Sequence, residues 1–201
     1  ELKLNDFIRC HGVRFVPGYV DLLWVTYCGK DNKYIVIVDY RKRKILHALA
    51  MPEQMQDTAF IGAYAVAPAR TNHIKVGAPY TGEMYATVYL FRLPQNLYSS
   101  PPQLIDTWHG SGHLDAMKEY GEQAYSANQY NDAVDVFGVS AAERIEQRRS
   151  IRGFGMPHGL DIRHDGLLAV TNYTDNTLRL LDLLSIPATA PSEDVFGRPE
   201  R

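Results

Sequence analysis

The feature that most constrains this chain is a short-stranded unit that recurs along it at intervals of about 45 to 51 residues. The clearest copy has apolar runs at 157–162, 167–173 and 177–183, separated by turns around Asp165-Gly166 and Asp175-Asn176. Such turn residues supply the positive φ angles that tight hairpins need. Short apolar runs bounded by them predict β-strands rather than helices. The unit therefore says much about architecture and little about chemistry.

Three earlier copies align with this one, and their first strands begin near residues 11, 62 and 113. The first copy has strands at 10–16, 22–28, 34–40 and 44–49, and the third at 113–117, 123–130, 133–137 and 144–147. The second copy is degenerate, with strands predicted at 63–67, 73–77 and 85–91. Units of this kind and period are typical of β-propeller blades.

We therefore predict an all-β fold, a β-propeller with about four recognisable four-stranded blades, within a single domain over 1–201. The blades are predicted at about 10–50, 58–108, 112–151 and 156–201, with 1–9 as a strand from, or for, a neighbouring blade. The chain starts at Glu1, inside what looks like a strand, so we expect a processed, trimmed or partial chain.

The segment 156–183 resembles a blade of the lactonase-like and NHL-like propellers. The matching steps are Pro157-His158-Gly159, the Asp165-Gly166 turn, the strand end Thr171-Asn172 and the pair Asn176-Thr177. The resemblance implies the propeller fold and, from lactonase-like relatives, a metal-assisted hydrolase, lyase or isomerase reaction. Those families have six or seven blades. Three arrangements thus remain open: a piece of a larger propeller, a ring completed by a second chain, or a four-bladed ring in which 1–8 supply the missing outer strand.

Composition excludes some classes of partner. The formal net charge is −2, so there is no electrostatic case for nucleic acid or for an anionic membrane surface. Apolar runs are too short to span a bilayer as a helix. Two cysteines, Cys10 and Cys28, do not form a disulfide framework; as predicted neighbours they would be buried thiols, one bridge, or soft metal ligands. The compartment stays open.

The candidate site lies where first strands begin and second strands end. In a propeller the first strand lines the axis, and antiparallel pairing sets its start across from the end of the second strand. Polar and aromatic groups should therefore gather around an axial funnel that takes a small molecule. These are His11, His113, His158, Tyr27, Cys28, Asn128, Gln129, Tyr130, Asn172 and Tyr173.

The histidines are the candidates for chemistry. His11, His113 and His158 would hold one divalent metal ion, or alternatively bond to backbone where each blade starts. Aligning Leu114-Asp115 with Leu160-Asp161 would shift His113 by one residue and turn it to the opposite face. Catalytic acid–base roles are predicted for His158, His113 and His109, the last within a glycine-rich segment, 108–113, interpreted as a mobile loop or a plain blade-to-blade link.

The remaining candidates are neutral or acidic. Substrate-binding roles are predicted for Tyr27, Asn128, Gln129, Tyr130, Asn172 and Tyr173. Asp115 and Asp161, with Arg14 at the matching place, would be ligands or general bases, or, as we favour, would pair with neighbouring blades. Two functions follow as alternatives: small-molecule binding in the axial funnel with metal-assisted catalysis, or a non-catalytic protein–protein interaction scaffold.

Overall fold

The computed structural model describes residues 10–29, 33–70 and 85–186, and their regular structure is β-sheet apart from one 3₁₀ turn. Four antiparallel sheets follow one another along the chain, which confirms the all-β prediction. The strands predicted at 1–9 and 73–77, and the end of the last blade, lie outside the described residues. Within these residues, no helix has the length and apolar character needed to cross a membrane.

Three sheets follow the predicted order of neighbouring strands. The first contains β1 (Cys10–Phe15), β2 (Leu22–Cys28), β3 (Lys33–Asp39) and β4 (Lys44–Ala50). The third contains β10 (Leu114–Tyr120), β11 (Gln123–Asn128), β12 (Ala133–Val139) and β13 (Ile145–Arg152). The fourth contains β14 (Pro157–Ile162), β15 (Leu167–Asn172) and β16 (Leu178–Asp182), followed by the 3₁₀ turn η1 (Leu183–Ser185).

The second sheet corrects the sequence interpretation. Its inner position is shared by two short strands, β5 (Gln54–Met55) and β6 (Ala59–Ile61), which both pair with β7 (Tyr64–Arg70). β8 (Tyr85–Arg92) and β9 (Gln103–Ser111) complete it. The run 63–67 is therefore in the second strand, not the first. The true inner strand was missed because the buried polar run 56–58 interrupts its apolar pattern.

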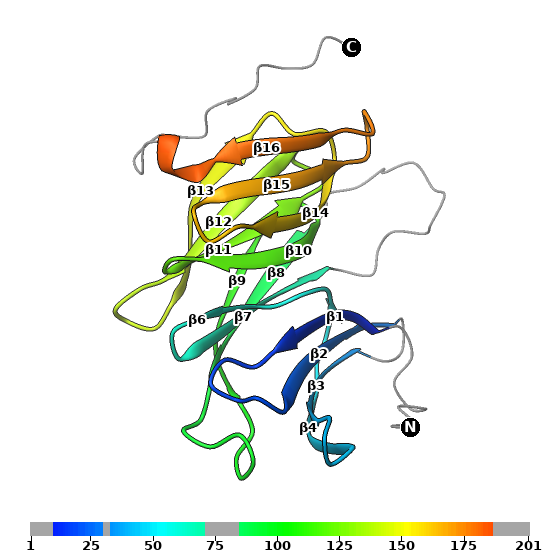
Figure 1. Ribbon diagram of the computed structural model, residues 1–201, viewed down its shortest axis with the longest axis vertical. Coiled ribbons are helices and arrows are strands. Elements are labelled where there is room, and N and C mark those ends of the chain that lie inside the picture. The colour runs from blue at the N-terminus through cyan, green and yellow to red at the C-terminus, as the bar shows by residue number, and fades with distance from the viewer. Residues whose placement is uncertain (1–9, 30–32, 71–84, 187–201) are drawn as a thin grey trace.

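Apolar layers between successive sheets form the core. Between the first and second sheets, the Trp24 ring meets Phe60 and Phe91 edge-on, with ring centroids 5.7 and 5.8 Å away. Trp108 and Phe137 pack similarly between the second and third sheets, at 5.1 Å. Figure 1 shows the first sheet at one end of this stack and the fourth at the other. The stacking brings the inner strands β6, β10 and β14 into contact.

Ion pairs join the inner strands of neighbouring sheets. Arg14 on β1 donates from Nε and Nη2 to the two oxygens of Asp57, at 3.0 and 2.8 Å, and Asp57 also accepts from the Met117 amide on β10 at 3.0 Å. Lys118 lies 3.4 Å from Asp161 at the joint between the third and fourth sheets. The favoured interpretation of Arg14 and Asp161, pairing between blades, is confirmed.

Candidate functional site

Each of three inner strands has a β-bulge near its start. A bulge kinks a strand and re-aims the side chain inside it, and bulges are common beside binding sites. The three bulges occupy the same place in the pairing register. In each, the inner strand advances by three residues while its partner strand advances by two. They lie between Cys10 and Val13 in β1, Leu114 and Met117 in β10, and Pro157 and Leu160 in β14.

Superposing the bulges shows which residues are equivalent. His11, Asp115 and His158 each occupy the first position after the bulge begins. The sequence had equated His113 with the other two histidines, or had shifted it by one residue, and both alignments are wrong. His113 precedes the bulge, and its counterpart in the fourth sheet is Met156. The third sheet therefore offers a carboxylate where its neighbours offer imidazoles.

Close packing around Gly12 explains why a glycine follows His11 in the first sheet. A Cβ at this position would lie 2.7 Å from Thr26 Oγ1 and 2.8 Å from the Gln56 carbonyl oxygen, which is too close for any side chain. The Gly12 amide donates to Thr26 Oγ1 at 2.9 Å, and Gly159 makes the same bond with Thr171. These bonds fix the bulges and hence the directions of His11 and His158.

Asp115 is the centre of the site. Its residue is 3% exposed, and its Oδ2 accepts from Gln129 Nε2 at 2.9 Å. His158 Nε2 lies 3.2 Å from the same oxygen, and His11 Nε2 lies 3.4 Å from Oδ1. The two imidazole side chains are 35% and 31% exposed. A buried carboxylate is thus linked to the surface by two histidines from two other sheets; we name these three residues the Asp115 cluster.

The two histidines of the cluster differ in their second nitrogen. His11 Nδ1 lies 2.9 Å from the Gln56 carbonyl oxygen, so both of its ring nitrogens face oxygens. The side chain thus bridges the Gln56 backbone and the Asp115 carboxylate. His158 stacks on Tyr173, with centroids 4.6 Å apart, and its Nδ1 has no hydrogen-bond partner in the described part of the chain. His158 is therefore the histidine that can exchange a proton with a bound molecule.

His113 is buried and neutral. The residue is 5% exposed, and its Nε2 lies 3.2 Å from a guanidinium nitrogen of Arg70. Because guanidinium only donates, Nε2 accepts and the ring proton resides on Nδ1. Burial lowers the pKa of His113 to about 4, with Asp115 opposing the shift and Arg70 adding to it. The buried Nδ1–H has no hydrogen-bond acceptor among the described residues.

The predicted metal set does not fit this geometry. A ligating imidazole must present a free lone pair to the ion. His113 Nε2 accepts from Arg70, and both nitrogens of His11 face protein oxygens. Among residues 10–29, 33–70 and 85–186, no group of three or more His, Cys, Asp or Glu side chains is arranged to hold a metal ion.

Asn128 and Asn172 are buried and bonded to the chain itself. Asn128 Oδ1 accepts from the His113 amide at 3.1 Å, while its Nδ2 donates to Asp135 at 2.7 Å. Asn172 Oδ1 accepts from the Gly155 amide at 3.1 Å. Both amides therefore hold the segment that leads into an inner strand, and their contact with substrate stays a prediction.

The predicted site also included Tyr27, Cys28 and His109. Tyr27 is fully buried in the apolar layer on the first sheet, and burial raises its pKa to about 12. Cys28 is buried, and no disulfide joins it to Cys10. His109 belongs to the outer strand β9, with Nδ1 3.3 Å from Thr87 Oγ1, so the predicted loop over the site is wrong for 108–111.

Sequence reasoning missed two contributors. Arg70 ends β7 and bonds to His113, and Gln56 supplies the carbonyl that His11 contacts. Both come from the second sheet, whose inner strand the sequence pattern misplaced. The buried polar run 56–58, between apolar β5 and β6, was the available signal.

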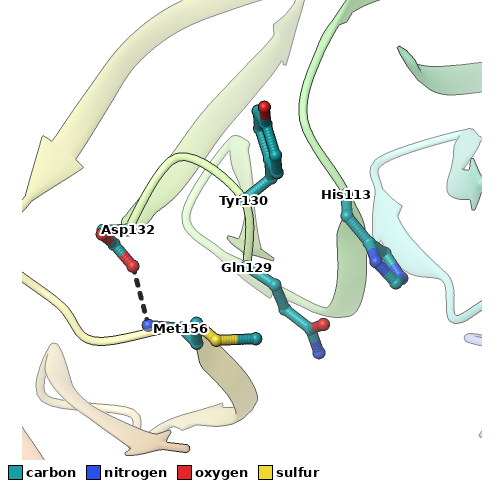
Figure 2. Close-up of a pocket in the computed structure, with 5 residues that line it drawn as sticks. All are labelled: His113, Gln129, Tyr130, Asp132 and Met156. Carbon is teal, nitrogen blue, oxygen red and sulfur yellow. Dashed lines mark hydrogen bonds between the residues drawn. The ribbon is translucent and has the colours of Figure 1, made fainter. Parts of the chain in front are cut away.

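A cavity of about 150 Å³ lies beside the cluster. It is lined by His113, Gln129, Tyr130, Asp132 and Met156. Figure 2 shows the His113 and Gln129 side chains extending toward the same region, with the end of the Met156 thioether pointing toward the Gln129 amide. Gln129 joins this cavity to the cluster because its Nε2 holds Asp115.

The fold is similar to that of solved lactonase-like propellers. A structure from Lactobacillus plantarum matches with a TM-score of 0.61 at 16% identity, over 86% of this chain and 54% of that one. Candidate 6-phosphogluconolactonases from Bacteroides fragilis and Bacteroides uniformis match with TM-scores of 0.56 and 0.60, at 17% and 13% identity. They are matched over 86% and 85% of this chain and 50% and 49% of theirs.

These similarities show the fold, at low sequence identity. No protein-family model matches the sequence. No curated protein matches it either. The chain spans about half the length of the solved structures that it matches, so its four sheets form a partial propeller.

Proposed function

We propose that the Asp115 cluster and the adjoining cavity form a small-molecule site in which His158 acts as general acid and base. The observation that carries this is the 3.2 Å approach of His158 Nε2 to a carboxylate whose residue is 3% exposed, while Nδ1 has no hydrogen-bond partner within the described chain. A buried carboxylate orients an imidazole and stabilises the imidazolium that forms on proton transfer.

The proton path follows from the contacts. His158 Nε2 lies 3.2 Å from Asp115 Oδ2, so in the proposed mechanism the ring proton is held on Nε2 and the lone pair of Nδ1 takes the proton of a water or of a substrate hydroxyl. The same nitrogen then returns the proton to the leaving group. Gln129 Nε2 donates to Asp115 Oδ2 and keeps the carboxylate in place, and His11 Nε2 lies 3.4 Å from Oδ1. The proposed reaction class is hydrolysis or elimination at a carbon–oxygen bond.

The matching structures suggest the first substrates to test. Two of them are named as candidate 6-phosphogluconolactonases. That name belongs to those proteins, and it supports starting with cyclic esters here. The experiment measures turnover of a panel of lactones by the wild type and by His158→Gln and Asp115→Asn.

Each of the two variants is expected to lose about 10²-fold or more of kcat, because each removes proton transfer or its orienting carboxylate. His164→Gln, at an exposed turn residue, is the control and should retain the wild-type rate. Wild-type turnover that survives in His158→Gln would overturn the proposed role.

The exposed aromatic rim supports the alternative of an interaction scaffold. Tyr130 and Tyr173 are 46% and 55% exposed, and Tyr173 lies directly on His158. Tyrosines of this kind are frequent anchors of protein interfaces. Absence of turnover with the lactone panel, together with a protein ligand whose affinity falls at least tenfold in Tyr173→Ala, would favour the scaffold.

A further inference from the structure

The outer strands of the first three sheets share a β-bulge, and the third sheet fills it differently from the other two. In β4, β9 and β13 the bulge inserts one extra residue, which is Leu46, Ile105 and Arg148 respectively. Leu46 and Ile105 pack against the apolar layers that join neighbouring sheets. An arginine thus stands where its counterparts are apolar, and such a departure from a pattern shared within a fold points to function.

Gly138 gives Arg148 its position. A Cβ at Gly138 would lie 2.8 Å from Arg148 Nε and 3.6 Å from Nη2, so the guanidinium group lies across β12 in the space that a side chain would fill. Glycine inside a strand weakens it and often marks a place that a ligand approaches closely. The bulge and the glycine together hold this cation against one face of the third sheet.

The guanidinium group of Arg148 is only partly paired. Its Nη1 lies 2.8 Å from Glu146 Oε2, and the two side chains are 43% and 44% exposed. Exposed ion pairs of this kind contribute little to stability. Among the residues that the structure describes, Nε and Nη2 have no hydrogen-bond partner. One edge of the guanidinium group is therefore available to a ligand.

Gln123 places a second donor beside Arg148. Gln123 and Gly138 are directly opposite each other on β11 and β12, so their side-chain positions share one face of the sheet, about 5 Å apart. Gln123 Oε1 accepts from the Tyr125 hydroxyl at 2.9 Å, which leaves its Nε2 hydrogens without an acceptor in the described part of the chain. A guanidinium edge next to an amide donor suits a carboxylate, which accepts several hydrogen bonds.

Arg148 and Gln123 both line a cavity of about 430 Å³, a volume that holds small organic ligands. Ile61, Tyr64 and Val139 give it apolar and aromatic walls, and the Glu122 carboxylate opposes a second negative charge. The cavity lies at the turn that follows β10, whereas Asp115 lies near the start of that strand, so the two sites are separate.

We propose that this cavity binds a small monocarboxylic acid with an apolar body, a class that 4-phenylbutyrate represents. The carboxylate accepts from the guanidinium group of Arg148 and from Gln123 Nε2, and the apolar body packs against Ile61, Tyr64 and Val139. This second site goes beyond the proposed function and does not depend on it.

The test is a titration of the wild-type chain with 4-phenylbutyrate, followed by saturation-transfer NMR on the ligand. We expect saturable binding with a dissociation constant in the millimolar range typical of so small a ligand. 4-Phenylbutyramide has the same body without the charge and should bind at least about tenfold more weakly. No saturable signal, or equal affinity for the acid and the amide, would overturn the inference.

Two arginine variants locate the binding. Arg148→Leu should bind 4-phenylbutyrate at least about tenfold more weakly, because it removes the guanidinium group. It should unfold at the same urea concentration as the wild type or at a higher one, because leucine fills the equivalent bulge in the first sheet. Arg163→Leu removes an exposed arginine from another turn and is the matched control, which should keep the wild-type affinity. Undiminished binding in Arg148→Leu, or a clear fall in its urea midpoint, would overturn the inference.

Discussion

At the scale of single residues, one carboxylate organises the site. The sequence drew attention to His11, His113 and His158, which a metal would have explained. The structure instead places Asp115 between the first and last of these. His113 differs from these two histidines because burial keeps its ring neutral, and its Nε2 accepts a hydrogen bond from Arg70.

The neutral state of His113 makes stability depend on pH. Its pKa falls from 6.5 to about 4 on folding, so between these values the unfolded chain binds a proton that the folded chain does not. Stability should therefore rise as the pH increases through this window, by at most about 1.4 kcal/mol per pH unit from this group. In His113→Asn, urea unfolding at several pH values should show a flatter dependence, and His164→Gln should match the wild type. Parallel curves for the wild type and His113→Asn would contradict the assignment.

Gly112 is the residue on which the position of His113 depends. Its φ is +125°, and a Cβ there would lie 2.3 Å from the Asn128 amide that holds the His113 backbone. Gly112→Ala should lower the free energy of unfolding by more than about 2 kcal/mol, from strain and the displaced amide. Gly121→Ala is the matched control: φ is +59° but the space is open, so the loss should be about 1 kcal/mol. Equal losses in urea unfolding would show that the contact with Asn128 does not matter.

At the scale of strands, the repeat predicted three sheets well and the second one poorly. The first, third and fourth sheets alternate apolar runs with Gly, Asn and Asp turns, and such turns fix register locally. The second sheet divides its inner strand at 56–58 because buried polar groups there bond to other sheets, as Asp57 does. Bonds across sheets leave no periodic trace in the sequence. For the same reason, His158 and Tyr173 could be placed together from the pattern, whereas Arg70 could not.

The pair between Arg14 and Asp57 ties three inner strands together. Its side chains are 23% and 12% exposed, so removing one partner leaves the other charge largely desolvated. Arg14→Met should cost about 2 to 4 kcal/mol of unfolding free energy in urea, and adding Asp57→Leu should restore part of the loss. The exposed pair of Arg163 and Asp165 is the comparison, and Arg163→Met should cost less than about 1 kcal/mol. A loss in Arg14→Met no larger than this would contradict the linking role.

At the scale of the whole molecule, the stack of sheets has two apolar ends. Leu178 and Leu180 on β16 are 62% and 55% exposed, and Val13 and Phe15 on β1 are 52% and 68% exposed. Every interior joint between sheets is apolar, so these ends are suited to the same kind of packing. We propose that a second chain covers the end formed by β16, as one of the arrangements that would complete the ring.

That arrangement predicts self-association of the 201-residue chain. Replacing Leu178 and Leu180 by Lys should shift the sedimentation coefficient toward that of a monomer, because charge at this face opposes packing. Leu104→Lys, on the outer strand β9 and 48% exposed, should leave the association unchanged. A wild-type chain that sediments as a monomer at all concentrations would exclude a second copy as the cover.

The buried amide of Asn172 also bears on how the chain could be modified. Asn172-Tyr173-Thr174 has the form of an acceptor for N-linked sugar, yet its nitrogen donates to Thr177 Oγ1 at 3.2 Å and the residue is 3% exposed. Attachment of a glycan therefore requires that this hairpin be open. In a cell that glycosylates the chain during synthesis, the fraction of chains with sugar at Asn172 would therefore measure how quickly the last blade folds.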